Sequence, residues 1–190
     1  MFVAAPAMEH CDLCHGAIPT RHAHLLELDS RRLICACAAC EDTATQNRRY
    51  RQVPGQTERL LDFRLTDGDW DALQIPIGMA FLFTTSAADN PVAFYPSPAG
   101  ATESLLGLEA WGQLVADNPV LAELQPDVEA LLVNRTKGSR EYWRVPIDRC
   151  YLLVGLIRTH WRGLSGGSEA WDAIDGFFAR LRANQADGHG

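Results

Sequence analysis

The sequence predicts an α+β protein, in which a small cysteine-rich segment is followed by a larger domain. Five of the six cysteines lie between residues 11 and 40, in a segment poor in large apolar side chains. From Leu60 onward, short aromatic and β-branched runs alternate with segments whose apolar residues recur every three or four positions. We therefore expect two domains, residues 9–45 and residues 60–184. The second should be an antiparallel sheet of about four strands, covered on one side by about four helices.

The composition excludes several classes of protein. The chain is 47% hydrophobic, which is enough to bury a core and excludes a disordered tail protein. Of the 24 acidic residues, 17 lie beyond residue 60, against 10 basic ones, and such a surface repels nucleic acid. No cationic flank precedes an apolar stretch at the N-terminus, and the apolar run at 150–157 is shorter than the ~20 residues that cross a membrane. We expect a cytoplasmic protein with no membrane span.

Two CxxC pairs stand at the ends of the cysteine-rich segment. Cys11 and Cys14 are followed by Gly16, a pattern typical of a metal-binding knuckle whose backbone N–H groups turn toward the thiolates. Cys37 and Cys40 form the second pair. In a protein that is not exported, closely spaced cysteines bind metal or carry redox chemistry more often than they form disulfides.

The residues between the two pairs predict how the pairs meet. His24–Asp29 and Leu33–Cys37 are strand-like runs on either side of a polar turn, which predicts a hairpin. Glu41–Thr43 are suited to the first turn of a following helix. Knuckle, hairpin and helix start are the parts of a treble-clef or zinc-ribbon-like finger. The polar stretch 42–59 contains Pro54 and Gly55, and predicts a frayed helix followed by a linker.

Four thiolates suit tetrahedral Zn²⁺, and closed four-cysteine sites stabilise a fold rather than perform chemistry. A segment without a hydrophobic core needs such a staple, and zinc binding supplies roughly 10 kcal/mol or more. We therefore expect a structural Zn²⁺ site on Cys11, Cys14, Cys37 and Cys40.

Two further residues are candidate ligands of the same ion. Cys35 lies on the same face of its strand as Cys37, so that either is a candidate third ligand, unless Cys35 is simply a small buried apolar residue. His24 begins the hairpin and is the histidine best placed to replace a cysteine. Five thiols also suit iron or an iron–sulfur cluster, which would make the protein a redox or electron-transfer protein.

The larger domain predicts its elements in order. Thr66 and Asp69 form a capping box that begins a short helix. Runs at 79–85 and 92–95 predict a hairpin, residues 96–102 a loop, and the stripe from Leu108 to Val115 a helix. The segments 128–134 and 142–145 predict a second hairpin, and helices follow from Asp148 and from Ser168.

The remaining candidate sites are weak, and no catalytic residue stands out. Cys150 lies within the apolar stripe of a helix and is expected to pack in the core. The loop at 96–104 has small and hydroxyl residues ahead of a helix, which favours an enzyme that binds a small anionic ligand as a third interpretation. No catalytic motif with the required spacing is present, so we expect a binding or assembly role rather than catalysis.

The chain also resembles a known family. The strings that carry the resemblance are CDLCHGAIPTRHAHLLELDSRRLICACAAC, DFRLTDGDWDALQIPIGMAF, FYPSPAGATES, NPVLAELQPDVEALLVNR and GLIRTHWRGLSGG, which together cover roughly residues 9–182. They resemble a bacterial family of unknown function whose members are often encoded beside [NiFe]-hydrogenase structural and maturation genes. The resemblance implies a cytoplasmic accessory protein of a hydrogenase, whose partner is a hydrogenase subunit or maturation factor. Cys11, Cys14, Cys35, Cys37 and Cys40 match the family's N-terminal motif, and the resemblance implies no particular reaction.

Overall fold

The chain folds into two compact units. The computed structural model describes residues 9–87, 91–97, 99–104, 108–162 and 166–187. One unit is Met1–Pro54 and the other Gly55–Gly190. Strands pair antiparallel throughout the described residues, and both helices and strands are present, as the sequence predicts.

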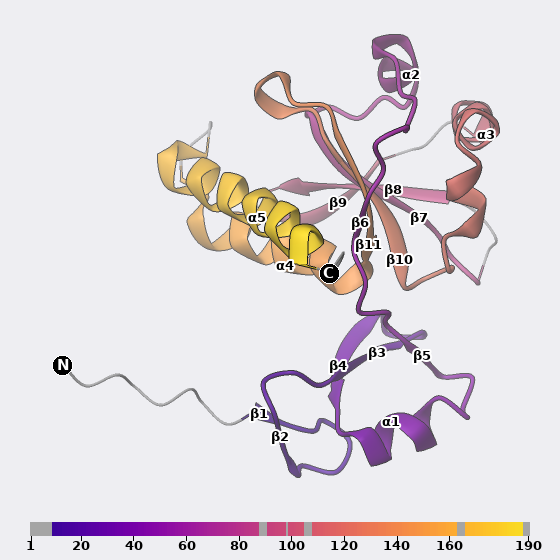
Figure 1. Ribbon diagram of the computed structural model, residues 1–190, viewed down its shortest axis with the longest axis vertical. Helices are drawn as coiled ribbons and strands as arrows, with labels where there is room; N and C mark the ends of the chain where they lie inside the picture. The colour runs from indigo at the N-terminus through magenta and orange to yellow at the C-terminus, as the bar shows by residue number, and fades with distance from the viewer. Residues whose placement is uncertain (1–8, 88–90, 98, 105–107, 163–165, 188–190) are drawn as a thin grey trace. The chain divides into compact units, whose positions relative to one another are not determined.

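The first unit is built on a three-stranded sheet in the order β4-β3-β5 (Figure 1). The predicted hairpin is confirmed as β3 and β4, which pair residue by residue from Ala23 with Ala36 to Glu27 with Arg32. A second pair, β1 with β2, flanks the first CxxC. The elements are β1 Glu9–His10, β2 Ala17–Ile18, β3 Ala23–Glu27, β4 Arg32–Ala36, α1 Ala38–Ala44 and β5 Tyr50–Gln52.

The segment after the second CxxC differs from the prediction. Helix α1 ends at Ala44, and β5 follows and pairs with β3, where a frayed helix and a linker were expected. Three residues, Tyr-Arg-Gln, are too short and too polar to show a period of two. The strand exists because the free edge of β3 offers backbone hydrogen-bonding partners, which no local pattern announces.

The second unit holds a six-stranded sheet in the order β6-β11-β10-β7-β8-β9, rather than the expected four strands (Figure 1). Its four α-helices match the expected number within the described residues. The elements are β6 Glu58–Arg59, α2 Asp67–Ala72, β7 Met79–Thr84, β8 Pro91–Ser97, β9 Gly100–Ser104, α3 Leu108–Asp117, β10 Glu129–Asn134, β11 Glu141–Pro146, α4 Ile147–His160 and α5 Gly167–Asp187, with short 3₁₀ helices at Pro119–Glu123 and Thr136–Gly138.

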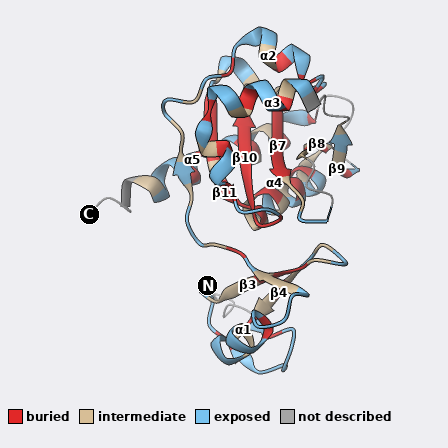
Figure 2. Ribbon diagram, turned by 90° about the vertical axis from the view of Figure 1, so that its right-hand side faces the viewer, coloured by how far each residue is buried: buried red, intermediate tan, exposed pale blue. Residues whose placement is uncertain are grey.

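Helices cover both faces of this sheet, so the expectation of one covered side is wrong. Helices α2 and α3 lie on one face and α4 and α5 on the other (Figure 1). Every residue of β10 is buried, as are the first five of β7, and both strands are red along their length in Figure 2. Strands buried on both faces carry continuous apolar runs instead of alternation. The runs at 79–83 and 130–133 are of this kind.

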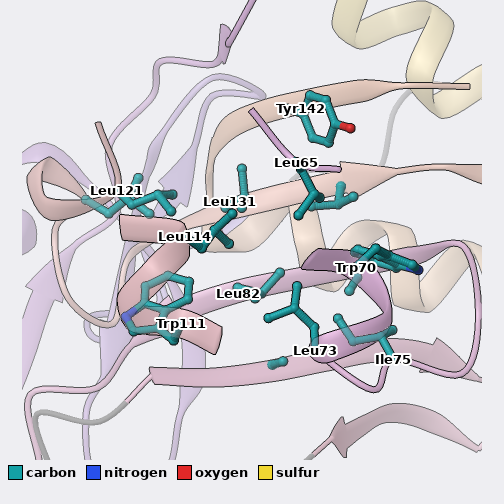
Figure 3. Packing of buried hydrophobic residues seen from close by; sticks show 14 residues of the cluster. Leu65, Trp70, Leu73, Ile75, Leu82, Trp111, Leu114, Leu121, Leu131 and Tyr142 are labelled. Atoms are coloured by element: carbon teal, nitrogen blue, oxygen red, sulfur yellow. The ribbon is translucent and has the colours of Figure 1, made fainter. Parts of the chain in front are cut away.

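The face beneath α2 and α3 carries the larger described cluster of buried side chains (Figure 3). Trp70 and Leu73 of α2 and Trp111 of α3 pack against Leu82 and Leu131 of the two central strands. On the opposite face, the ring of Phe94 stacks on those of Phe81 and Phe83, with centroids 5.6 and 5.8 Å apart. Because neighbouring strand residues point to opposite faces, the two central strands serve both layers.

The segment 96–104 is not a loop where the structure describes it. Strands β8 and β9 form a hairpin there, with Ser97 opposite Gly100 and Tyr95 opposite Thr102. Residue 98 lies outside the described residues, as do 163–165 of the glycine-rich stretch. Small residues and two prolines gave little strand signal, and pairing with β8 supplies the backbone hydrogen bonds instead. The sequence argument for an anion site therefore loses the loop on which it was based.

No helix in the described part of the chain combines the length and the apolar character that a membrane crossing requires.

Candidate metal centre

The first CxxC lies in the turn between β1 and β2. The backbone N–H of Cys11 donates to the carbonyl of Gly16 at 2.8 Å, and that of His15 donates to the carbonyl of Cys11 at 2.8 Å. His15 adopts a left-handed conformation with φ of 61° and so carries the reversal that the sequence analysis associated with Gly16. The backbone N–H groups of Leu13 and Cys14 face the sulfur of Cys11, which is the arrangement expected of a knuckle.

The second CxxC lies at the junction of β4 and α1. Cys37 is the residue immediately before α1, and Cys40 lies in its first turn. Asp12, from inside the first CxxC, holds the two pairs together. Its backbone N–H donates to the carbonyl of Cys35 at 2.8 Å, and its Oδ2 accepts from the N–H of Cys35 at 2.6 Å. The knuckle is thereby fixed to β4 next to the start of α1.

The sulfurs of Cys11, Cys14, Cys37 and Cys40 converge. All four lie within 4.8 Å of one another, and the sulfurs of Cys14 and Cys37 are 3.8 Å apart. A tetrahedron of sulfurs around a metal, with metal–sulfur bonds of about 2.3 Å, has edges of about 3.8 Å. The cluster could therefore hold a metal ion with little rearrangement. Cys11 is buried, and the other three are more accessible.

The thiols of this cluster have strongly perturbed pKa values. Burial raises the pKa of Cys11, but backbone N–H donors from Cys37, Cys14 and Leu13 outweigh it and lower the pKa to about 6. Hydrogen bonds to the sulfurs of Cys37 and Cys14, and then burial, raise the pKa of Cys40 to about 12. The four sulfurs thus share protons unequally, because several thiolates at this distance repel one another. A divalent cation can take the place of those protons.

Cys35 and His24, the two additional candidate ligands, lie in a different group. Their ligand atoms lie within 4.8 Å of each other and of His22, apart from the four-cysteine cluster. Burial, and then the negative charge of Asp12, raise the pKa of the Cys35 thiol. Sequence reasoning did not single out His22. The signal was available, since His22 and His24 are two residues apart and the predicted hairpin places His24 near Cys35.

The other sequence candidates lie in the second unit. Cys150 is fully buried on α4, and burial raises the pKa of its thiol well above the ordinary value. His160 is the last residue of α4. Neither lies in a group that could hold a metal among the described residues.

Comparison with known proteins assigns the family. No curated protein and no solved structure matches the chain. The model of a family of unknown function, DUF5947, matches residues 10–185. This match includes both CxxC pairs and nearly all of the second unit, and it carries no activity, metal or partner with it. The chain therefore belongs to the family of unknown function DUF5947.

Proposed function

We propose that the first unit is a treble-clef finger in which Cys11, Cys14, Cys37 and Cys40 hold one structural Zn²⁺ ion. The observation that carries this proposal is the convergence of four sulfurs at the spacing of a tetrahedral site. The order of the parts supports the fold, because a knuckle supplies the first two sulfurs and the start of a helix the second two, with the β3–β4 hairpin between them.

The size of the hydrophobic core supports a structural role for the ion. A compact cluster in the first unit has four buried residues, Leu25, Ile34, Ala36 and Ala44, with Tyr50 packed against it. Two of the four are alanines, so this cluster buries little apolar area. Zinc binding of roughly 10 kcal/mol supplies what such a cluster lacks.

The protein as a whole is proposed to be a non-enzymatic accessory or assembly protein of a [NiFe] hydrogenase, acting in the cytoplasm. Two arguments support this role. A closed four-thiolate site offers no open coordination position for chemistry. The resemblance noted in the sequence is to proteins encoded beside hydrogenase genes, which favours a hydrogenase subunit or maturation factor as the partner.

Metal analysis of protein purified without air tests the ion. Cys11→Ser and Cys40→Ser should each remove one equivalent of zinc, because a missing thiolate opens the tetrahedral site. Cys150→Ala is the matched control and should remove none, since Cys150 lies buried on α4. Unchanged zinc in both cysteine variants of the cluster would contradict the proposal.

Iron is the second candidate, because four thiolates suit a single iron or an iron–sulfur cluster as well as they suit zinc. It would make the protein an electron carrier. Absorption between ~350 and 550 nm by anaerobically purified protein separates the two metals, since zinc is silent there. Colourless protein with stoichiometric zinc and no iron removes this candidate.

Affinity capture from cells that produce the hydrogenase tests the partner. The first unit carries an arginine-rich edge, of which Arg21 and Arg48 are exposed, and we propose this edge as the contact surface. Wild-type bait should recover a hydrogenase subunit or maturation factor, and Arg21→Glu with Arg48→Glu should recover less. Arg180→Glu on α5 is the charge-matched control. Recovery of no hydrogenase component with wild-type bait would refute the association.

A further inference from the structure

A second group of potential metal ligands lies in the first unit, and the four-cysteine site does not use it. It consists of His22, His24 and Cys35, whose ligand atoms all lie within 4.8 Å of one another. From this juxtaposition we propose that the three residues form a second, separate metal site for a divalent ion such as Zn²⁺, with one coordination position open.

The hairpin register brings the three side chains together. His24 on β3 lies directly opposite Cys35 on β4. His22 precedes His24 by two residues, and residues two apart on extended backbone share a face. The imidazole rings of His22 and His24 meet edge to face, with centroids 5.0 Å apart and an interplanar angle of 75°. Two strands with this register therefore present two imidazoles and one thiol on one side of the sheet.

The imidazole of His22 has the environment of a metal ligand. Its side chain is only 5% exposed, and its Nε2 atom is buried without a hydrogen-bond partner. Its Nδ1 atom lies 2.9 Å from the carbonyl oxygen of Pro19 and 3.3 Å from the carboxylate of Glu9. Both neighbours are acceptors, so Nδ1 carries the proton and the lone pair is on Nε2. Metal-binding histidines are held in this way by a carbonyl or carboxylate on the nitrogen remote from the ion.

A buried lone pair without a partner costs about 1–3 kcal/mol, so the protein needs something to occupy that position. A metal ion bound to Nε2, His24 and the sulfur of Cys35 satisfies it. The surroundings favour a cation, because the carboxylates of Glu9 and Asp12 lie beside His22 and Cys35 respectively. The hydrogen bonds between Asp12 and the backbone of Cys35 also join the second group to the knuckle of the first.

The ligand set indicates what this site can do. Two imidazoles and a thiolate suit borderline transition-metal ions. Three protein ligands leave the fourth tetrahedral position to water or another external ligand, which distinguishes reactive or exchangeable zinc sites from closed structural ones. No fourth ligand is grouped with the three among the described residues. The second ion should therefore exchange faster than the first and accept an external ligand.

Metal counting on the full chain tests the proposal. The protein is stripped with a chelator under reducing conditions, reloaded with Zn²⁺ and freed of unbound metal. Wild type should hold two ions per chain, and His22→Gln and Cys35→Ser should each hold one. His10→Ala is the matched control, an exposed histidine of β1 outside both groups, and should keep two. The ion retained in the two variants also reports that the four-cysteine site remains formed.

Co²⁺ gives an independent readout. Added to protein that already holds one Zn²⁺, Co²⁺ should produce visible d–d bands and a thiolate charge-transfer band. Cys35→Ser should lose the charge-transfer band. The proposal is overturned by one ion in wild type that Cys35→Ser retains, by two ions in His22→Gln and Cys35→Ser, or by loss of both ions from these variants. Cys40→Ser removes the other ion, so the failure of either site is seen separately.

Discussion

Glu27 shows at the scale of one residue how the first unit holds a buried charge. The side chain lies on β3 and is nearly inaccessible, yet it meets three polar groups. Ser30 Oγ donates to its carboxylate, Arg49 Nε donates to Oε1 at 2.9 Å, and Arg32 lies within 3.9 Å. The hydrogen bond from Ser30, followed by that from Arg49, lowers the pKa of Glu27 below its ordinary value. The ionised form is thus favoured in the folded state.

This lowered pKa predicts a pH dependence. A carboxyl group whose folded pKa is depressed stabilises the protein above its unfolded pKa of about 4.3, and that stabilisation is lost as the pH falls through the folded value. Glu27→Gln should therefore lower the melting temperature of the first unit at pH 7, with a smaller penalty near pH 3. Calorimetry of both proteins at a series of pH values checks this.

Metal release in acid affects both proteins alike, so the difference between them isolates the carboxylate. Asp42→Asn is the control, since Asp42 is an exposed acid of α1. A Glu27→Gln penalty that does not change with pH would show that the carboxylate contributes by packing rather than by charge.

At the scale of an element, α2 follows its local sequence closely. The Thr66 hydroxyl accepts from the backbone N–H of Asp69 at 3.1 Å, and the Asp69 carboxylate accepts from the N–H of Thr66 at 2.8 Å. This confirms the predicted capping box. The helix then buries Trp70 in the core, where the guanidinium of Arg135 lies 5.4 Å from the centroid of its ring. A six-residue helix needs both its cap and its packing, because it is too short to be stable alone.

Removal of the cap should destabilise the second unit. Thr66→Ala leaves the N–H of Asp69 without its side-chain acceptor and should cost about 1 kcal/mol in the free energy of unfolding. Thr66→Ser keeps the hydroxyl and should remain close to wild type. Urea unfolding followed by tryptophan fluorescence measures both. Equal stabilities for the alanine and serine variants would show that the cap contributes nothing.

At the scale of the whole molecule, the two units rest on different sources of stability. The second unit has large apolar clusters on both faces of its sheet, whereas the first has a core cluster of four buried residues and two groups of potential metal ligands. All five tryptophans lie in the second unit, namely Trp70, Trp111, Trp143, Trp161 and Trp171. Their fluorescence therefore reports on the second unit.

Chelation of the metal should unfold one unit and spare the other. With EDTA in excess, the amide resonances of residues 9–54 should lose their dispersion, because the first unit has little apolar burial to replace the ion. The tryptophan emission maximum should stay constant, and added Zn²⁺ should restore the lost resonances. Retention of the dispersed amide signals in metal-free protein would show that the first unit folds without an ion.

Much of this protein could be predicted from local pattern. The two CxxC pairs, the hairpin between them, the cap of α2 and the hairpin β10–β11 all depend on neighbours within a few residues along the chain, where backbone conformation and side-chain period carry the information. The edge strands β5 and β9 did not show such a pattern, because they form on an existing strand and their short, small or polar residues have little preference of their own.

The sequence by itself determined which residues have the chemistry to bind a metal, since thiols and imidazoles concentrated in one segment are legible without a fold. Only the tertiary structure decided how they divide. It grouped Cys37 and Cys40 with Cys11 and Cys14, and turned Cys35 toward His22 and His24. The physical reason is strand geometry at the end of β4. Cys35 is held in the sheet opposite His24, whereas Cys37 lies past the last paired residue, where the chain turns into α1.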